Sequence, residues 1–233
     1  MCVPRSRTNV SGPSEVCSNV SDCHSESCNS VRGGDVTRRH AVLQKGVTMM
    51  LRSVNVSVAL ADATDDITTR ALLKQAGFVL PRTGGGGRAK GGDILAPRGI
   101  GTDTKPLVVD FTVVNERTAK WVADPFPADS AEQKKCGIYR GMYDKITYGF
   151  RGFGMEIGGR LGPEAEALIQ LAQGLWWDIH GKKVLPSGAN WTCPSFASYW
   201  RQRLVGAVQR FNATMAVGRA RRVAQLRVAR DWA

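Results

Sequence analysis

The chain has 233 residues and a formal net charge of +12, from 32 Lys and Arg against 20 Asp and Glu. This length is enough for one domain with a substantial core, or for two small ones. Hydrophobic residues make up 42 % and charged residues 22 %, which excludes a wholly disordered chain. No apolar run approaches the ~18 residues that a membrane-spanning helix needs, and residues 1–15 lack the apolar segment of a signal peptide. We therefore expect a soluble protein that is neither secreted nor membrane-bound.

Positive charge is concentrated near the C-terminus. Residues 201–233 contain eight arginines and one acid, Asp231, and so carry +7 of the net charge of +12. Such an excess favours a polyanion, because each phosphate that a protein neutralises releases condensed counterions. The alternative is an arginine-rich helix face whose only role is to keep the protein in solution. Of the two, we expect nucleic acid as the partner.

The first part of the chain predicts an arm followed by a helix, a strand and a second helix. Residues 1–35 show neither helical nor strand periodicity and form the predicted arm. Apolar residues at helical spacing in 42–51 predict an amphipathic helix, and alternating valines in 54–58 predict a strand with one buried face. A short helix is expected over 65–77. The glycine-rich segment 82–92 lacks the Gly-Lys-Ser/Thr signature of a phosphate-binding loop, so we expect a plain loop.

The second part alternates strands and helices. Residues 107–114 are apolar on both faces and predict a central strand. The other expected elements are a polar helix over 130–143, a bent strand over 148–157, a helix that begins at Pro163 and a final helix over 196–229. This alternation predicts an α/β fold, organised as the arm (1–35), a core over residues 36–185 and a basic helical extension over 186–233.

Two aspartates stand out against their apolar surroundings. Asp110 interrupts the predicted central strand, where an ionised carboxylate is costly unless a cation compensates it. Asp93 precedes the apolar pair Ile94-Leu95 and suits the end of a neighbouring strand. Two carboxylates that converge from adjacent strands can hold a hard divalent cation, which activates water and stabilises charge on a phosphate oxygen.

A lysine is expected to assist this pair. Lys134 and Lys135 lie on the predicted polar helix, and Tyr139 lies one turn after Lys135 on the same face. A lysine beside two carboxylates can orient a nucleophile or neutralise a phosphoryl transition state. We prefer Lys135 over Lys134 because it faces Tyr139. In the alternative, a basic structural or ribosome-associated protein, both aspartates are incidental and lie far apart.

The order of these residues is shared with a known family. An Arg-His pair is followed by two separated aspartates and then by a lysine and a tyrosine on a helix, here Arg39, His40, Asp93, Asp110, Lys135 and Tyr139. This order resembles the restriction-like endonuclease at the C-terminus of certain non-LTR retrotransposon polyproteins. The segment 155–165 and the arginine-rich last helix, with Asn212-Ala213, are similar too. The resemblance covers about residues 23–225.

The resemblance implies a restriction-endonuclease-like core of the PD-(D/E)XK type, with a central mixed sheet flanked by helices and a long basic C-terminal helix. It implies that the domain nicks DNA by phosphodiester hydrolysis with Mg²⁺ or Mn²⁺, with Asp93 and Asp110 as metal ligands and Lys135 and Tyr139 as further catalytic residues. In this subgroup the lysine has moved from the strand to the following helix, which fits Thr112 at the usual lysine position.

The resemblance also implies partners and a place of action. In such elements the domain nicks chromosomal DNA so that the free end primes reverse transcription, which implies DNA, element RNA within a larger polyprotein, and a nuclear location. No membrane is expected. The expected DNA contacts are Arg39, His40, Arg219, Arg221 and Arg222.

Two departures from the family pattern keep a second function open. Gly92 stands where the family has a proline before the first aspartate. Related proteins often carry a glutamate after the first strand, and here only Asp62 could substitute for it. The alternative is therefore a catalytically inactive DNA-binding remnant of such a domain.

The N-terminal arm contains soft metal ligands. Cys17 and the cluster Cys23, His24 and Cys28 provide enough of them for Zn²⁺, and the family has a zinc knuckle in this region. The Cys-x5-Cys-His-x3-Cys spacing is not a standard finger, and the adjacent Cys23 and His24 do not easily reach one tetrahedral ion. Two interpretations stay open: a zinc site, or a decayed knuckle.

Overall fold

A computed structural model gives the structure of the protein, and it describes residues 35–60, 71, 74, 92–140, 143, 145–189 and 192–231. Several predictions lie outside the described residues. They concern the arm with Cys17, Cys23, His24 and Cys28, the acid Asp62, the glycine-rich loop up to residue 91, and most of the helix expected over 65–77.

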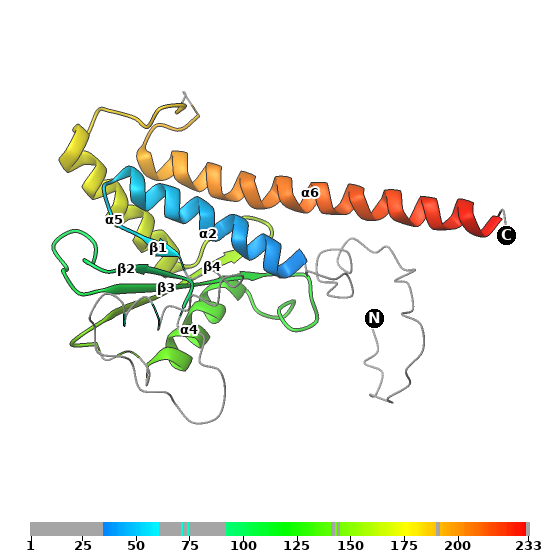
Figure 1. Ribbon diagram of the computed structural model, residues 1–233, viewed down its shortest axis with the longest axis horizontal. Coiled ribbons are helices and arrows are strands. Elements are labelled where there is room, and N and C mark those ends of the chain that lie inside the picture. The colour runs from blue at the N-terminus through cyan, green and yellow to red at the C-terminus, as the bar shows by residue number, and fades with distance from the viewer. Residues whose placement is uncertain are drawn as a thin grey trace.

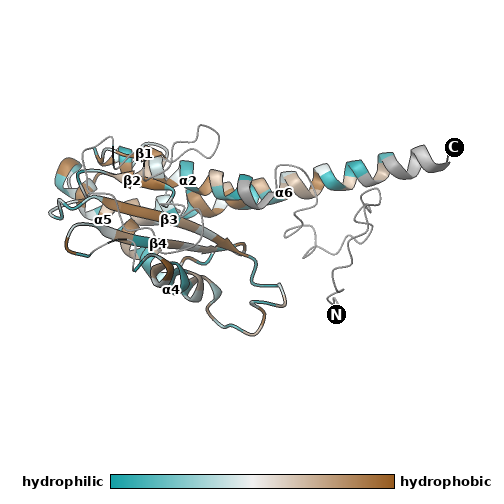
Figure 2. Cartoon of the chain, turned by 60° about the horizontal axis from the view of Figure 1, so that its bottom comes forward, coloured by the Kyte–Doolittle hydropathy of each residue, from teal (hydrophilic) through white to brown (hydrophobic). Residues whose placement is uncertain are grey.

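A four-stranded mixed sheet forms the centre of the fold (Figure 1). Its strands, in spatial order, are β1 (Ala59–Leu60), β2 (Ile94–Ala96), β3 (Leu107–Val114) and β4 (Gly149–Glu156). Strand β2 pairs antiparallel with β1 and with β3, whereas β4 pairs parallel with β3 along its whole length. The prediction of a central strand over 107–114 is confirmed, and Figure 2 shows β3 as an apolar strand in the interior of the sheet.

Helices cover both faces of this sheet (Figure 1). The helices α2 (Asp35–Ser53), α5 (Pro163–His180) and α6 (Phe196–Asp231) lie on one face, and α4 (Pro127–Tyr139) lies on the other. The chain is therefore an α/β protein with a mixed sheet flanked by helices, as the alternation of elements predicted. Within the described part of the chain, no helix is both long enough and apolar enough to cross a bilayer.

The side chains of β3 alternate between two hydrophobic clusters, since successive residues of a strand point to opposite faces. Val109 and Phe111 pack into the larger cluster, beneath α2, α5 and α6. Val108 joins a smaller cluster on the α4 side, which contains Leu95, Tyr139, Tyr143 and Tyr148. Asp110 is two residues from Val108, so the strand directs it to the α4 side as well.

The first half of α6 belongs to the larger cluster. Its buried side chains include Phe196, Trp200, Leu204 and Val208. The helix runs alongside α2 and then projects beyond the rest of the domain (Figure 1). The hydrophobic core therefore continues past residue 185 into the segment that the sequence assigned to a basic extension.

The strand predicted for residues 54–58 is wrong. Val54 and Asn55 form a turn after α2, in which their N–H groups donate to the carbonyl oxygens of Leu51 and Arg52 at 3.2 and 3.1 Å. Asn55 adopts a φ of 60°, which a strand does not permit. Val54 and Val58 are nevertheless buried, so the alternation of valines marked burial rather than strand pairing.

The sequence predicts a strand with a bend at its glycines over 148–157, and the structure has β4 in this place. All eight residues of β4 pair with β3 without interruption. Its glycines instead let α4 approach the sheet, because a Cβ atom at Gly154 would lie 2.6 Å from the carbonyl oxygen of Ala128. Gly154 is therefore required here by the close approach of α4 to the sheet.

Glu132 joins α4 to the beginning of α5. Its side-chain oxygens accept hydrogen bonds from the N–H groups of Gly154, Glu164 and Ala165 at 2.7, 2.9 and 3.0 Å. The first N–H groups of a helix have no partner within the helix, so the carboxylate of Glu132 caps α5 from a distance in sequence. Burial raises the pKa of Glu132 to about 7, although these hydrogen bonds act in the opposite direction.

We expect the replacement of Glu132 with alanine to lower the free energy of unfolding by about 3 kcal/mol or more, because it leaves three backbone N–H groups without their acceptor. Gln133→Ala, on an exposed position of the same helix, should change it by less than about 0.5 kcal/mol. Urea denaturation followed by circular dichroism measures both. Equal effects would contradict the capping role.

Candidate functional site

Asp93, the residue before β2, lies beside Asp110 of β3. Ile94, the first residue of β2, pairs with Val109, which precedes Asp110 in the chain. The N–H group of Asp93 donates to the carbonyl oxygen of Val109 at 2.9 Å. The two carboxyl groups are close enough that each affects the pKa of the other. The structure therefore brings together two acids that the sequence separates, and the wide separation expected if both were incidental is not found.

Gly92 determines how the chain enters this site. It adopts a φ of +83°, and a Cβ atom on it would lie 2.4 Å from Cγ1 of Val108. Proline holds φ near −65°, so it cannot take this conformation. Gly92 stands where the endonucleases that the sequence resembles have a proline, and its left-handed backbone conformation is one that proline could not adopt.

Helix α2 holds Asp93 from one side. His40 Nε2 lies 2.9 Å from Asp93 Oδ2, and the N–H of Phe111 donates to the same oxygen at 2.6 Å. Gln44, one turn after His40, donates from Nε2 to the carbonyl oxygen of Asp93 at 2.7 Å. Burial opposes ionisation of Asp93, but the hydrogen bond and charge of His40, with the Phe111 N–H, hold its pKa below the usual value.

Helix α4 holds Asp110 from the other side. Lys135 Nζ forms an ion pair with Asp110 Oδ2, and Tyr139 donates its hydroxyl to Oδ1 at 3.4 Å. Burial and the negative charge of Asp93 raise the pKa of Asp110 to about 6, although Lys135 acts in the opposite direction. Burial and the nearby carboxylates also raise the pKa of Tyr139, so it keeps its proton and acts as a donor.

Two carboxyl groups of this arrangement, those of Asp93 and Asp110, could bind a cation. The described residues contain no group of three or more His, Cys, Asp or Glu side chains arranged to hold a metal ion. Mg²⁺ is commonly bound in this way, by one or two carboxylates together with phosphate oxygens.

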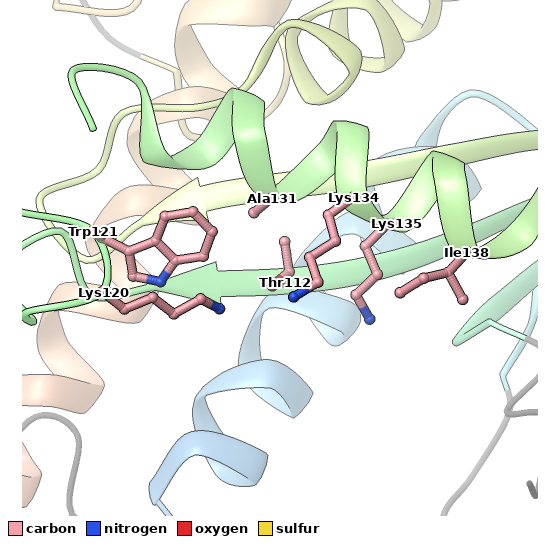
Figure 3. Close-up of a pocket in the computed structure, with 7 residues that line it drawn as sticks. All are labelled: Thr112, Lys120, Trp121, Ala131, Lys134, Lys135 and Ile138. Atoms are coloured by element: carbon pink, nitrogen blue, oxygen red, sulfur yellow. The ribbon is translucent and has the colours of Figure 1, made fainter. Parts of the chain in front are cut away.

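A pocket of about 200 Å³ is shown in Figure 3, and its lining includes Lys135, the ion-pair partner of Asp110. We call it the lysine pocket, and its lining residues are Thr112, Lys120, Trp121, Ala131, Lys134, Lys135 and Ile138. The sequence had pointed to Lys134 and Lys135, but it gave no signal for Lys120 or Trp121, which follow β3 in an irregular segment.

The residues expected to contact DNA are placed in three different ways. Arg39 is 3 % exposed and donates from Nε to Oδ1 of Asn212 at 2.7 Å, so it joins α2 to α6. His40 contacts Asp93. On α6, Arg219 is half-buried, whereas Arg221 and Arg222 are exposed. The buried contact of Arg39 is a structural one, and the exposed arginines are those of the projecting half of α6.

Comparison of the chain with protein-family models, with curated proteins and with solved structures gives no match. The interpretation of the site therefore rests on its geometry and charge. The side chains that define it come from α2, from the paired strands β2 and β3, and from α4.

The ionisation of Asp110 should make stability depend on pH. Its pKa of about 6 in the folded state exceeds the ordinary value of 3.8, so its contribution to stability is lost as the pH rises through this range. Asparagine does not titrate. Without divalent cations, we expect the unfolding free energy of the wild type, relative to that of Asp110→Asn, to fall by about 2 kcal/mol between pH 4 and pH 7.5.

Urea denaturation of both proteins across this pH range measures the difference. Asp178→Asn, which removes an exposed carboxylate on α5, is the control for a change in net charge. A difference that stays constant or increases with pH would contradict a raised pKa at Asp110.

Proposed function

We propose that this chain is a metal-dependent DNA endonuclease that nicks DNA by phosphodiester hydrolysis, with Mg²⁺ or Mn²⁺ as its cofactor. One observation carries the proposal: Asp93, just before β2, and Asp110, on β3, lie side by side, with Lys135 ion-paired to Asp110. Two adjacent buried acids are unfavourable unless cations compensate them, and the raised pKa of Asp110 reflects that cost. Carboxyl groups with a pKa perturbed by burial and by a specific charged neighbour are candidates for a functional site.

The donor set fits Mg²⁺. Asp93 and Asp110 would hold the ion, since hard divalent cations prefer carboxylate oxygens. When bound, Mg²⁺ activates water and stabilises charge that develops on a phosphate oxygen.

The chain's own residues keep the two acids in position. His40 and the N–H of Phe111 fix the side chain of Asp93, while Gln44 fixes its backbone. Tyr139 donates to Asp110 and so orients that carboxyl group. Lys135, whose side chain is 30 % exposed, would neutralise charge on a phosphate bound at the acids.

The order of these residues also supports a restriction-endonuclease-like identity of retrotransposon origin. In that setting the substrate is chromosomal DNA, the place of action is the nucleus, and element RNA within a larger polyprotein is a further partner. The exposed arginines Arg221 and Arg222 on α6 support a nucleic-acid partner.

Asp93→Asn and Asp110→Asn should each reduce the nicking of supercoiled plasmid, in Mg²⁺ or Mn²⁺, by about 100-fold or more, because each removes a metal ligand without a large change in shape. Asp178→Asn should nick at the wild-type rate. Gel electrophoresis of timed digests measures the conversion to open circles. Nicking that survives both changes would refute the assignment.

A second candidate is a DNA-binding remnant without hydrolytic activity. It is favoured by the partners of Asp93, whose Oδ2 atom already contacts His40 and Phe111, and by the presence of only two acids in the described part of the site. In this case α6 would provide the DNA contact.

Calorimetric titration with Mn²⁺ separates the two candidates. An endonuclease should bind Mn²⁺ in a manner that Asp110→Asn weakens at least about 10-fold, since that change removes a ligand. A remnant should bind duplex DNA but show the same Mn²⁺ titration before and after the substitution.

A further inference from the structure

The lysine pocket gathers three lysines (Figure 3), and one of them, Lys135, connects it to Asp110 through an ion pair. Its volume of about 200 Å³ is several times the ~30 Å³ that one water molecule occupies in the liquid. Three of the described residues that line it are lysines, and none of them is acidic. The pocket therefore has both the space and the charge for an anionic group.

The fold brings these lysines together from two segments. Lys134 and Lys135 are successive residues of α4, whereas Lys120 comes from the segment that joins β3 to α4. Thr112 lies two residues after Asp110 on β3, hence on the same face of the strand. Figure 3 shows the lysine side chains from α4 and from the joining segment reaching over β3 toward the same pocket.

Two of the three lysines have no acidic partner. Lys135 is ion-paired with Asp110, but Lys120 and Lys134 form no ion pair with any residue that the structure describes. Lys120 Nζ lies 4.2 Å from the centre of the Trp121 ring, a cation–π contact that keeps its ammonium group at the pocket. Like charges gathered in one pocket repel each other, so binding an anion would stabilise this arrangement.

We propose that the lysine pocket is a phosphate subsite, which binds the DNA backbone phosphate next to the one at Asp93 and Asp110. Lys120 and Lys134 contact this phosphate, and the hydroxyl of Thr112 is a further donor. The inference rests on the proposed function, since it takes the reacting phosphate to lie at the two acids. Lys135 lines the lysine pocket and also pairs with Asp110. A phosphate bound in the pocket would therefore determine which neighbouring phosphate of the strand lies at the two acids.

The test compares two double substitutions that remove the same charge. Lys120→Gln with Lys134→Gln changes the pocket, while Lys182→Gln with Lys183→Gln changes two exposed lysines after α5. Fluorescence anisotropy with a labelled duplex oligonucleotide, without divalent cations, gives the affinity at several salt concentrations. We expect the pocket variant to bind about 10-fold more weakly and to lose about 0.9 from the salt slope, which corresponds to one phosphate contact.

The matched pair should keep the wild-type slope, and arginine at both pocket positions should restore binding. Equal slopes for the two glutamine pairs would overturn the subsite. All four positions substituted in the two pairs are exposed, so the fold should tolerate the changes, and circular dichroism verifies this.

Nicking and Mn²⁺ binding by the same variants separate this inference from the proposed function. If both are right, the pocket variant keeps its Mn²⁺ affinity but needs about 10-fold more DNA for half-maximal nicking. A lowered salt slope in a chain that never nicks would leave the phosphate subsite standing and remove the endonuclease. If nicking depends on Asp110 but the salt slope of the pocket variant is no lower than that of the control pair, the endonuclease stands and the phosphate subsite is overturned. If the protein does not bind DNA at all, both are overturned.

Discussion

The placement of Asp93 against Asp110 is the constraint around which the neighbouring elements are arranged. Two carboxyl groups that meet in a largely buried place repel each other, and each has lost most of its hydration. The protein compensates them separately: α2 supplies His40 to one acid, and α4 supplies Lys135 to the other. Because these helices lie on opposite faces of the sheet, the pair is held from both sides. The result is an asymmetric pair, in which the pKa of Asp93 is lowered and that of Asp110 is raised.

The parts of this arrangement that could be predicted are those with a local signal. The apolar run around Asp110 indicated a buried strand, and the one-turn spacing of Lys135 and Tyr139 indicated which lysine would face the acid. The parts that could not be predicted depend on contacts between distant segments. Gln44 has no feature that points to the backbone of Asp93, and no motif marks Glu132 as the cap of another helix.

Two sequence patterns, the alternating valines after α2 and the glycines of β4, have a different physical cause from the one that they suggest. Alternating valines after α2 are typical of a strand, yet they are buried by a turn that folds back against the helix. Glycines in β4 are typical of a bend, yet they provide clearance for α4. The valines correctly indicated burial, and the glycines correctly indicated a place where a side chain would not fit. The backbone conformation at both places depends on tertiary packing.

The continuity of α6 links the interior of the domain to its outermost charges. One end of the helix is anchored among core side chains such as Leu204, and the other carries Arg221 and Arg222 without an intervening hinge. An α-helix advances ~1.5 Å per residue and bends little, so the distance from the anchored end to these arginines is fixed to a first approximation. A polyanion bound at the far end of α6 would therefore lie at a nearly constant distance and angle from the sheet.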